Sequence, residues 1–156
     1  MNPRRTLEEA LLLLPHGREF RFVDRLLSLD HGKSGVAEYT VRGDEYYLRG
    51  HLPGEPILPG VLLVEAGAQL AGVIAQNDPV IPELPGLKLA ALRAVKFFGS
   101  AHPGDTVRLE ASITGRLGAL VQAKAAASVD GVKVMTSELT LSAEATPEEV
   151  AAQQSS

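Results

Sequence analysis

The stretch PGVLLVEAGAQLAGVIAQ, residues 59–76, is almost wholly apolar and predicts one long buried helix. Pro59 suits the first helical position, because its fixed φ favours the helix and its missing N–H is not needed there. From Gly60 to about Gln76, Val, Leu, Ile, Ala or Gly occupies nearly every position, so the helix has no polar face. We therefore expect it to be enclosed on most sides, by a sheet and, in an assembly, by a partner chain.

Two polar residues interrupt this helix, Glu65 and Gln69, and they lie four positions apart. That spacing makes them neighbours on one stripe of the helix surface. A buried carboxylate without partners costs several kcal/mol, so it is normally hydrogen-bonded, paired or protonated. Taken alone, the helix favours a structural network, for instance one that bridges neighbouring elements across a dimer, over a catalytic role.

The loop before the helix favours the catalytic role. His51 lies 14 residues before Glu65, and Pro53, Pro56 and Pro59 stiffen the path between them. A lone histidine in a loop usually belongs to the polar surface. A histidine and a glutamate held beside a helix N-terminus, however, supply a base, an acid and oriented N–H donors. We therefore interpret the loop and the helix as one functional site.

Strand patterns dominate the sequence on either side of this stretch. The predicted strands are Phe20–Asp30, Ser34–Val41, Lys88–Phe98, Thr106–Thr114, Ala119–Val129 and Val132–Ala143. Asp130 and Gly131 predict a two-residue hairpin turn, because both residue types tolerate positive φ. Residues 78–86 contain three prolines and are expected to form a loop. The chain is therefore predicted to be an α+β protein, an antiparallel sheet wrapped around one long central helix.

The two ends of the chain carry weaker patterns. The N-terminus MNPRRTLEEALLLLPHG has arginines before leucines, as a signal peptide would, but Glu8 and Glu9 interrupt it and no cleavage site follows. We expect a short helix there, with Thr6 and Glu9 at capping-box spacing. Residues 146–156 are polar and are expected to be a frayed tail or a weak terminal helix, which leaves residues 1–145 as one folded domain.

The composition is that of an ordinary globular protein, with 156 residues, 45% of them hydrophobic and 22% charged. Because there is no cysteine, disulfides, thiol catalysis and cysteine-ligated metals are excluded, and the cytoplasm is the expected compartment. A net charge of −4 and a pI near 5.6 argue against a general nucleic-acid binder. The longest apolar run, residues 57–74, is a poor membrane span, because a carboxylate and an amide interrupt it. The four histidines, His16, His31, His51 and His102, show no ligand spacing, so no metal site is expected.

Three segments together resemble the signature of one enzyme family. GHLPGEPILPGVLLVEAGAQ, from Gly50 to Gln69, is similar to the motif G-H-F-P-G-x-P-I-x-P-G-V-x-x-x-E-A-x-A-Q of the 3-hydroxyacyl-(acyl carrier protein) dehydratases of fatty acid synthesis, which have a hot-dog fold. Leu52 stands where that family usually has phenylalanine. Upstream, LLPHGREFRFVDRLLSLD is similar to the family's LPHRxPFLLVDRV, and downstream KFFGSAHPGD is similar to its RFxxPVxPGD. The resemblance extends from about Leu14 to Ala143 and implies a single hot-dog domain.

The resemblance implies a role for each residue that matches the central motif. His51 falls on the family's catalytic histidine, and Glu65 falls on its catalytic glutamate. The backbone N–H of Gly60 falls on the donor to the oxyanion, and Pro59 and Val61 are expected to support it. No cofactor is implied.

The same comparison implies a type of enzyme and an assembly. Gln69 falls on the family's glutamine, which we expect to hold Glu65. A related branch that also isomerises the double bond has aspartate in place of this glutamate, so the resemblance implies the dehydratase-only type. In the family the histidine of one subunit faces the glutamate of the other, which implies a homodimer or, at a larger size, a trimer of dimers. The implied partner is an acyl carrier protein bearing a 3-hydroxyacyl group on phosphopantetheine, and neither nucleic acid nor membrane insertion is expected.

The implied reaction removes a C2 proton and a C3 hydroxyl from a 3-hydroxyacyl thioester. His51 fits the base, because imidazole accepts protons near neutral pH. The N–H of Gly60, at the positive end of the helix, fits the thioester oxygen as charge develops there. Glu65 fits the acid that protonates the leaving hydroxyl, or a group that orients a water for that step. The sequence leaves both roles of Glu65 open.

Two other functions also remain open, a hot-dog acyl thioesterase and a non-catalytic acyl-binding homologue. Arg93 and Ser100 stand where the family usually has aspartate and proline, near the strand expected to line an acyl tunnel together with the helix. Arg93, Lys96 and Arg116 are interpreted either as contacts for an acidic carrier protein or as ordinary solvated charges.

Overall fold

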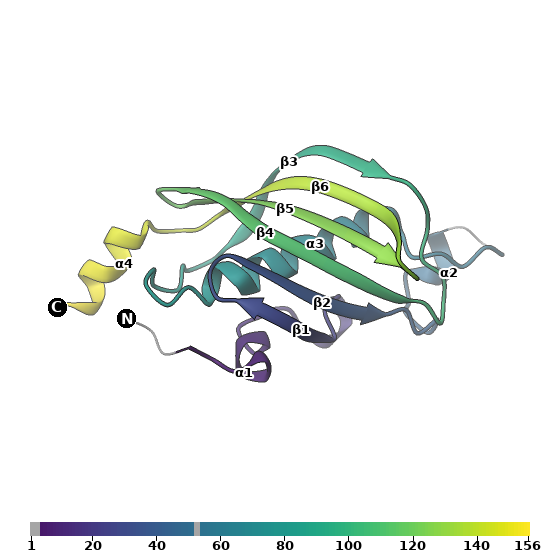
Figure 1. Cartoon of the computed structure of the whole chain (residues 1–156), viewed down its shortest axis with the longest axis horizontal. Coiled ribbons are helices and arrows are strands. Elements are labelled where there is room, and N and C mark those ends of the chain that lie inside the picture. Colours follow the sequence, from purple (N-terminus) through teal and green to yellow (C-terminus); the bar gives the residue numbers. More distant parts are fainter. Residues whose placement is uncertain (1–3, 52–53) are drawn as a thin grey trace.

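A six-stranded antiparallel sheet wraps around one long helix, as Figure 1 shows. The computed structural model describes residues 4–51 and 54–156, so the sequence predictions that concern Leu52 and Pro53 lie outside the described residues. Along the sheet, the strands follow the order β1 (Arg25–Asp30), β2 (Ser34–Thr40), β4 (Thr106–Leu117), β5 (Leu120–Val129), β6 (Val132–Ser142) and β3 (Lys88–Phe97). The helices are α1 (Leu7–Leu11), α2 (Leu48–His51), α3 (Gly60–Gln76) and α4 (Pro147–Gln154), with a 3₁₀ turn at Arg18–Phe20. The predicted α+β architecture is confirmed.

The central helix α3 begins and ends where the sequence predicted. Most of its side chains are buried against the inner face of the sheet, which accounts for the missing polar face. Pro59 differs from the prediction: it is the N-cap residue and not the first helical residue, because its ψ of 131° is extended. Its carbonyl oxygen accepts a hydrogen bond from the N–H of Leu62 at 2.9 Å, which starts the helix.

A glycine sets the distance between α3 and the sheet. A Cβ atom added at Gly67 would lie 2.8 Å from the Cβ of Ala125 in β5, closer than two such atoms can approach. The absence of a side chain at this position, facing the smallest side chain on β5, lets the helix lie directly on the strand. The buried face of the central helix therefore fits the sheet only with small residues at this crossing.

Strand β1 is shorter than predicted, because it begins at Arg25 and not at Phe20. The backbone at Phe20 and Phe22 is held by a side chain of α3. The amide of Gln69 accepts a hydrogen bond from the N–H of Phe22 and donates one to the carbonyl oxygen of Phe20, both at 2.8 Å. Phe22 and Val23 of this segment are buried in the core. The N–H of Phe22 and the carbonyl oxygen of Phe20 bond to the helix side chain, whereas the N–H of Asp24 donates to the carbonyl oxygen of Glu38 in β2 at 2.8 Å.

The turns between strands largely follow the sequence patterns. Asp130 and Gly131 both have positive φ, at 49° and 78°, and form the predicted hairpin between β5 and β6. Strand β4 runs three residues past the predicted end at Thr114, to Leu117. It continues because Gly118, with a φ of 57°, forms a tight turn directly into β5.

Both terminal segments form helices with capping boxes. In α1, the side chains of Thr6 and Glu9 exchange hydrogen bonds with each other's backbone N–H, as predicted. The same arrangement of Thr146 and Glu149 starts α4, so the helical alternative holds for the C-terminal residues. Figure 1 places α4 at the end of the molecule opposite α2. Among the described residues, no helix has both the length and the apolar character needed to cross a membrane.

Candidate functional site

The polar stripe of α3 is built around a fully engaged amide. The side chain of Gln69 is buried, and its oxygen accepts the N–H of Phe22 while its nitrogen donates to the carbonyl oxygen of Phe20. The same nitrogen also donates to Oε1 of Glu65 at 3.2 Å. One glutamine thus fastens the segment before β1 to the helix and restrains the carboxylate one turn earlier.

Glu65 faces a cavity of about 530 Å³ that runs along α3. The walls are contributed by α3, by residues 13–16, by residues 86–89 and by Leu141 of β6. The carboxylate is 22% exposed, so within one chain it is partly open and not fully enclosed as the helix pattern predicted. The arrangement gives a carboxylate at the wall of a largely apolar space, which suits a reaction on a substrate with an apolar chain.

A histidine that the sequence analysis did not assign to the site also lines this cavity. Nε2 of His16 lies 3.5 Å from Oε1 of Glu65, and the two residues are 49 positions apart in the sequence. Arg21 holds the segment in place, since its guanidinium donates to the carbonyl oxygens of Leu14 and His16. The available signal was a histidine that follows a run of leucines and a proline, but nothing in the spacing linked it to the helix.

His51 lies at the last position of α2 and is exposed to solvent. The sequence predicts a loop at this position, whereas the structure has one short helical turn. In Figure 1, α2 lies at one end of the molecule. Within residues 4–51 and 54–156 of one chain, no hydrogen bond or ion pair joins His51 to Glu65.

A buried carboxylate anchors the segment that leads into α2. Glu45 accepts hydrogen bonds from the hydroxyl of Tyr39 at 2.9 Å and from the N–H groups of Arg42 and Gly43 at 2.8 and 2.7 Å. Its own carbonyl oxygen accepts the N–H of Leu48, the first residue of α2. The loop is therefore held by one side chain three residues before the short helix that ends at His51.

The ionisation of this network follows from its contacts. Burial alone would raise the pKa of Glu45, but the N–H groups of Arg42 and Gly43 and the hydroxyl of Tyr39 hold it below its ordinary value. Burial, with hydrogen bonds to Tyr47 and Glu45, raises the pKa of Tyr39. Glu45 is thus an ionised acceptor and Tyr39 a neutral donor.

The start of α3 offers backbone donors. Among the described residues, none of the hydrogen bonds uses the N–H of Gly60, which lies at the positive end of the helix dipole. A Cβ atom at Gly60 would lie 2.9 Å from the ring of Phe97 in β3, so the absence of a side chain allows this close packing. Val61 is 69% exposed, which leaves this end of the helix accessible.

The three basic residues considered for a carrier protein differ in their surroundings. Arg116 is partly buried, donates to the carbonyl oxygen of Ala75 at the C-terminal end of α3 and pairs with Asp78. Burial lowers the pKa of Arg116, and the nearby carboxylate opposes that shift. Arg116 therefore stabilises the end of the helix and is not a solvated surface charge. Arg93 is exposed and pairs with Glu138 at 3.3 Å.

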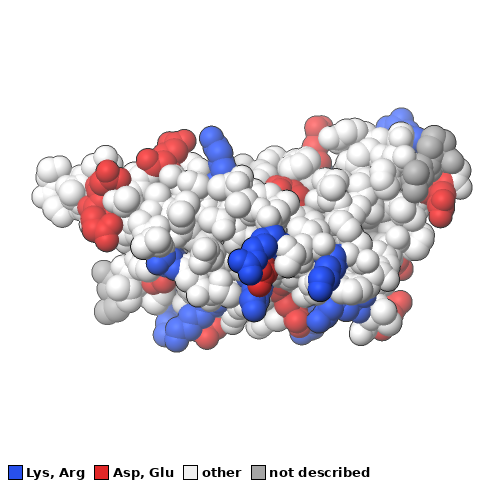
Figure 2. All heavy atoms as spheres, turned by 90° about the horizontal axis from the view of Figure 1, so that it is seen from above, with Lys and Arg blue, Asp and Glu red and all other residues white. Residues whose placement is uncertain are grey.

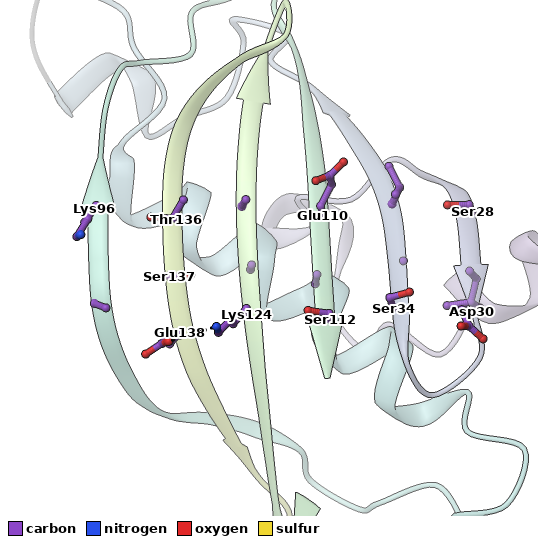
Figure 3. A pocket seen from close by; sticks show the side chains of 17 residues that line it. Ser28, Asp30, Ser34, Lys96, Glu110, Ser112, Lys124, Thr136, Ser137 and Glu138 are labelled. Carbon is purple, nitrogen blue, oxygen red and sulfur yellow. Dashed lines mark ion pairs between the residues drawn. The ribbon is translucent and has the colours of Figure 1, made fainter. Parts of the chain in front are cut away.

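A second hollow, of about 780 Å³, lies on the outer face of the sheet (Figure 3). Figure 3 shows the side chains of Lys96, Lys124, Glu110 and Glu138 around it, and short side chains such as Ser112 between them. Lys124 and Glu138 form an ion pair at 3.9 Å. None of the predicted catalytic or oxyanion residues lines this hollow, whereas Glu65 and Gln69 line the cavity beside α3.

Comparison with known proteins identifies relatives of this chain. Residues 14–138 match the model of the FabA-like domain family. A 3-hydroxyacyl-[acyl-carrier-protein] dehydratase from Bacillus pumilus is 38% identical over 130 residues, which are 83% of this chain and 90% of that protein. A dehydratase of the same name from Roseiflexus is 37% identical over 136 residues, 86% of this chain and 93% of that protein.

A solved structure agrees with these relatives in fold. The dehydratase heterocomplex ApeI:P from Xenorhabdus doucetiae contains a chain that superposes with a TM-score of 0.72 at 18% identity. The match covers 94% of this chain and 97% of that one. The likeness supports the hot-dog arrangement of sheet and helix that the resemblance implied.

Proposed function

Because the chain belongs to the FabA-like domain family, we propose that it is a 3-hydroxyacyl-[acyl-carrier-protein] dehydratase. It removes water from 3-hydroxyacyl thioesters on acyl carrier protein and yields trans-2-enoyl thioesters for fatty acid biosynthesis. The single observation that carries this proposal is the similarity to curated dehydratases along more than four fifths of the chain. The cavity that Glu65 faces supports it, since its apolar walls suit an acyl chain. We expect the enzyme to act in the cytoplasm, as its cysteine-free sequence suggested.

The proposed reaction assigns one role to each site residue. His51 takes the C2 proton, and the N–H of Gly60 donates to the thioester oxygen as negative charge develops there. Glu65 gives a proton to the C3 hydroxyl, so that the C3–O bond breaks, water leaves and a C2–C3 double bond forms. Solvent then returns the proton from the imidazolium to the carboxylate. Gln69 restrains Glu65 through its amide nitrogen.

We further propose that the site is completed by a second copy of the chain. Within one chain, His51 makes no contact with Glu65, although the reaction needs both groups at one substrate. In a homodimer, Glu65 would face His51 of the partner subunit. A trimer of dimers is the larger assembly that the family resemblance allows.

Strand β3 is the surface that supports such a dimer. It is the last strand of the sheet, and nearly every one of its residues is exposed, including Leu89, Leu92 and Phe97. The face of the molecule that Figure 2 shows from above, on the side where β3 lies in Figure 1, has large uncharged areas between its charged side chains. An edge strand that exposes large apolar side chains favours pairing with another chain, and a second β3 would cover these side chains.

One assay distinguishes the dehydratase from its two alternatives. The purified protein is incubated with a short 3-hydroxyacyl carrier thioester, and enoyl product and free thiol are followed together. We expect enoyl product, and its loss in both His51→Ala and Glu65→Gln, because the first removes the base and the second removes the proton donor. Glu148→Gln in α4 changes an exposed carboxylate and is the matched control, with activity unchanged.

The other outcomes contradict the proposal in distinct ways. Free thiol without enoyl product would indicate a thioesterase, in which the carboxylate activates water. A folded protein that binds acyl chains but forms neither enoyl product nor free thiol would indicate a non-catalytic acyl-binding homologue.

A further inference from the structure

The carboxylate of Glu65 is engaged through one oxygen only. Oε1 accepts the amide N–H of Gln69 at 3.2 Å and lies 3.5 Å from Nε2 of His16. Oε2 has no hydrogen bond or ion pair with any residue in the described part of the chain. The two oxygens of this group are therefore unequal before any substrate binds.

Both groups that approach Oε1 are fixed in space. Gln69 is bound to the backbone at Phe20 and Phe22, and the segment of His16 is bound by the guanidinium of Arg21. His16 also lies beside the ring of Phe20, with the ring centroids 6.3 Å apart. Hydrogen bonds to the backbone of residues 14–22 thus restrain both the glutamine on α3 and the segment that carries the histidine.

The surroundings of the imidazole select its tautomer. Nδ1 of His16 is buried and has no hydrogen-bond partner among the described residues, whereas Nε2 points to the carboxylate. With its hydrogen on Nε2, the ring directs its donor at Oε1 and leaves only a lone pair on Nδ1. The reverse tautomer would bury an unpaired N–H and place two acceptors against each other.

We propose that His16 is a positioning residue for dehydration, which holds Glu65 so that Oε2 faces the leaving hydroxyl. The terminal torsion of a glutamate is broad, so a carboxylate held by one donor can rotate. The hydrogen bond from Gln69 and Nε2 of His16 at 3.5 Å place two fixed groups beside Oε1, which restricts that rotation and leaves Oε2 to give its proton to C3–OH. This inference rests on the proposed function, because it assigns a task to Glu65 in that reaction.

A set of three substitutions tests the inference. In His16→Gln the amide nitrogen is as many bonds from Cβ as Nε2 is, so the donor to Oε1 is kept. His16→Asn places its nitrogen where Nδ1 was, and His16→Leu has no donor. We expect His16→Leu and His16→Asn to lower kcat about 10- to 100-fold, the effect of removing one polar partner from the site, with KM changed less than about 3-fold. His16→Gln should stay within about 3-fold of the unchanged enzyme in kcat.

Two controls separate this inference from the proposed function and from misfolding. Thermal midpoints of unfolding and subunit assembly are compared for all variants. Glu65→Gln is the reference variant, in which dehydratase activity is expected to be lost completely. If Glu65→Gln is inactive but all three His16 variants keep full kcat, the positioning role is wrong and the dehydratase stands. Equal loss in His16→Gln and His16→Leu would also overturn it, because the donor at Nε2 would then not matter.

If the unchanged protein shows no dehydration, the proposed function is wrong. The effect of His16 on the position of Glu65 is then tested by crystal structures of the variants alone. We expect one position of the Glu65 side chain and one plane of its carboxylate in the unchanged protein and in His16→Gln, and more than one in His16→Leu. A single orientation in all three would contradict the inference.

Discussion

Two glutamates of this chain show how surroundings give the same side chain different tasks. Glu45 is buried and its two oxygens accept three hydrogen bonds, so it is saturated and serves the structure. Glu65 lines a cavity and has contacts through only one of its oxygens within the described residues, so the other is left for a substrate. The sequence predicted a special role for Glu65 because it interrupts an apolar helix, whereas Glu45 stands in a polar segment where no such contrast exists.

The saturated glutamate predicts a pH-dependent stability. Its pKa in the fold is held below the ordinary value of 4.5, so its contribution is complete above that value and is lost as pH falls through the lower pKa of the folded state. We expect Glu45→Gln to lower the free energy of unfolding by about 2 kcal/mol at neutral pH. The substitution replaces a charged carboxylate that accepts three hydrogen bonds with a neutral amide. Urea denaturation from pH 7 down to pH 3 measures this, and the difference from the unchanged protein should shrink below the ordinary pKa.

The matched control is Glu148→Gln, an exposed carboxylate in α4 that should leave the unfolding curve unchanged at every pH. A difference between Glu45→Gln and the unchanged protein that stays constant over the whole pH range would contradict the role of its charge.

The candidate site could be predicted only in the part that lies along one stretch of sequence. The spacing of Glu65 and Gln69 places both on one stripe of a helix, and their hydrogen bond agrees with that placement. The contact of Glu65 with His16 could not be predicted, because it depends on how residues 13–16 cross the helix in three dimensions. The partial exposure of Glu65 also depends on that packing and not on the local pattern.

At the scale of elements, the match between predicted and observed bounds depended on which groups form the backbone hydrogen bonds. Helix α3 matched its predicted bounds, because an apolar run with a proline before it has few alternatives. Strand β1 began late because Gln69, far along the chain, takes the hydrogen bonds of Phe20 and Phe22. Helix α2 was missed because four residues that include Gly50 carry no helical periodicity.

Two glycines of α3 predict opposite effects of the same substitution. Gly67→Ala adds a Cβ atom 2.8 Å from the Cβ of Ala125, so the helix must move away from β5, and we expect a loss of about 1–3 kcal/mol in unfolding free energy. Gly72→Ala meets its nearest atoms, on Leu87 and Leu141, only at 4.0 Å. Because alanine favours a helix over glycine, we expect Gly72→Ala to be neutral or to stabilise by up to about 1 kcal/mol.

Chemical denaturation of the two variants, in parallel with the unchanged protein, measures both effects. The two glycines belong to the same helix, so each variant is the control for the other. Equal changes in unfolding free energy for both substitutions would show that helix propensity, and not the contact with β5, decides the outcome.

At the scale of the whole molecule, the proposed site requires two chains, and this can be tested by mixing inactive variants. His51→Ala and Glu65→Gln are each expected to be inactive. In a mixed dimer, one of the two sites combines the intact histidine of one chain with the intact glutamate of the other. Equal mixing with free subunit exchange makes about half of the dimers mixed, and each mixed dimer has one intact site of two. We therefore expect about a quarter of the activity of the unchanged protein to return.

The double variant His51→Ala/Glu65→Gln is the control for this experiment. Mixed with either single variant, it forms no site that has both groups, so it should restore nothing. If the two single variants remain inactive together although mass spectrometry of the native complex shows exchanged subunits, then the site does not lie between two chains.

The proposed pairing through the exposed edge strand β3 would also make the concentration of the protein a determinant of its turnover. If pairing of two such edges completes each site, then turnover per chain depends on the fraction of chains that are paired, which follows the law of mass action. At concentrations far below the dissociation constant of the pair, a folded chain would keep its cavity and its Glu65 but lack the base opposite it. Dilution would then act on this enzyme as an inhibitor does, without any change in its fold.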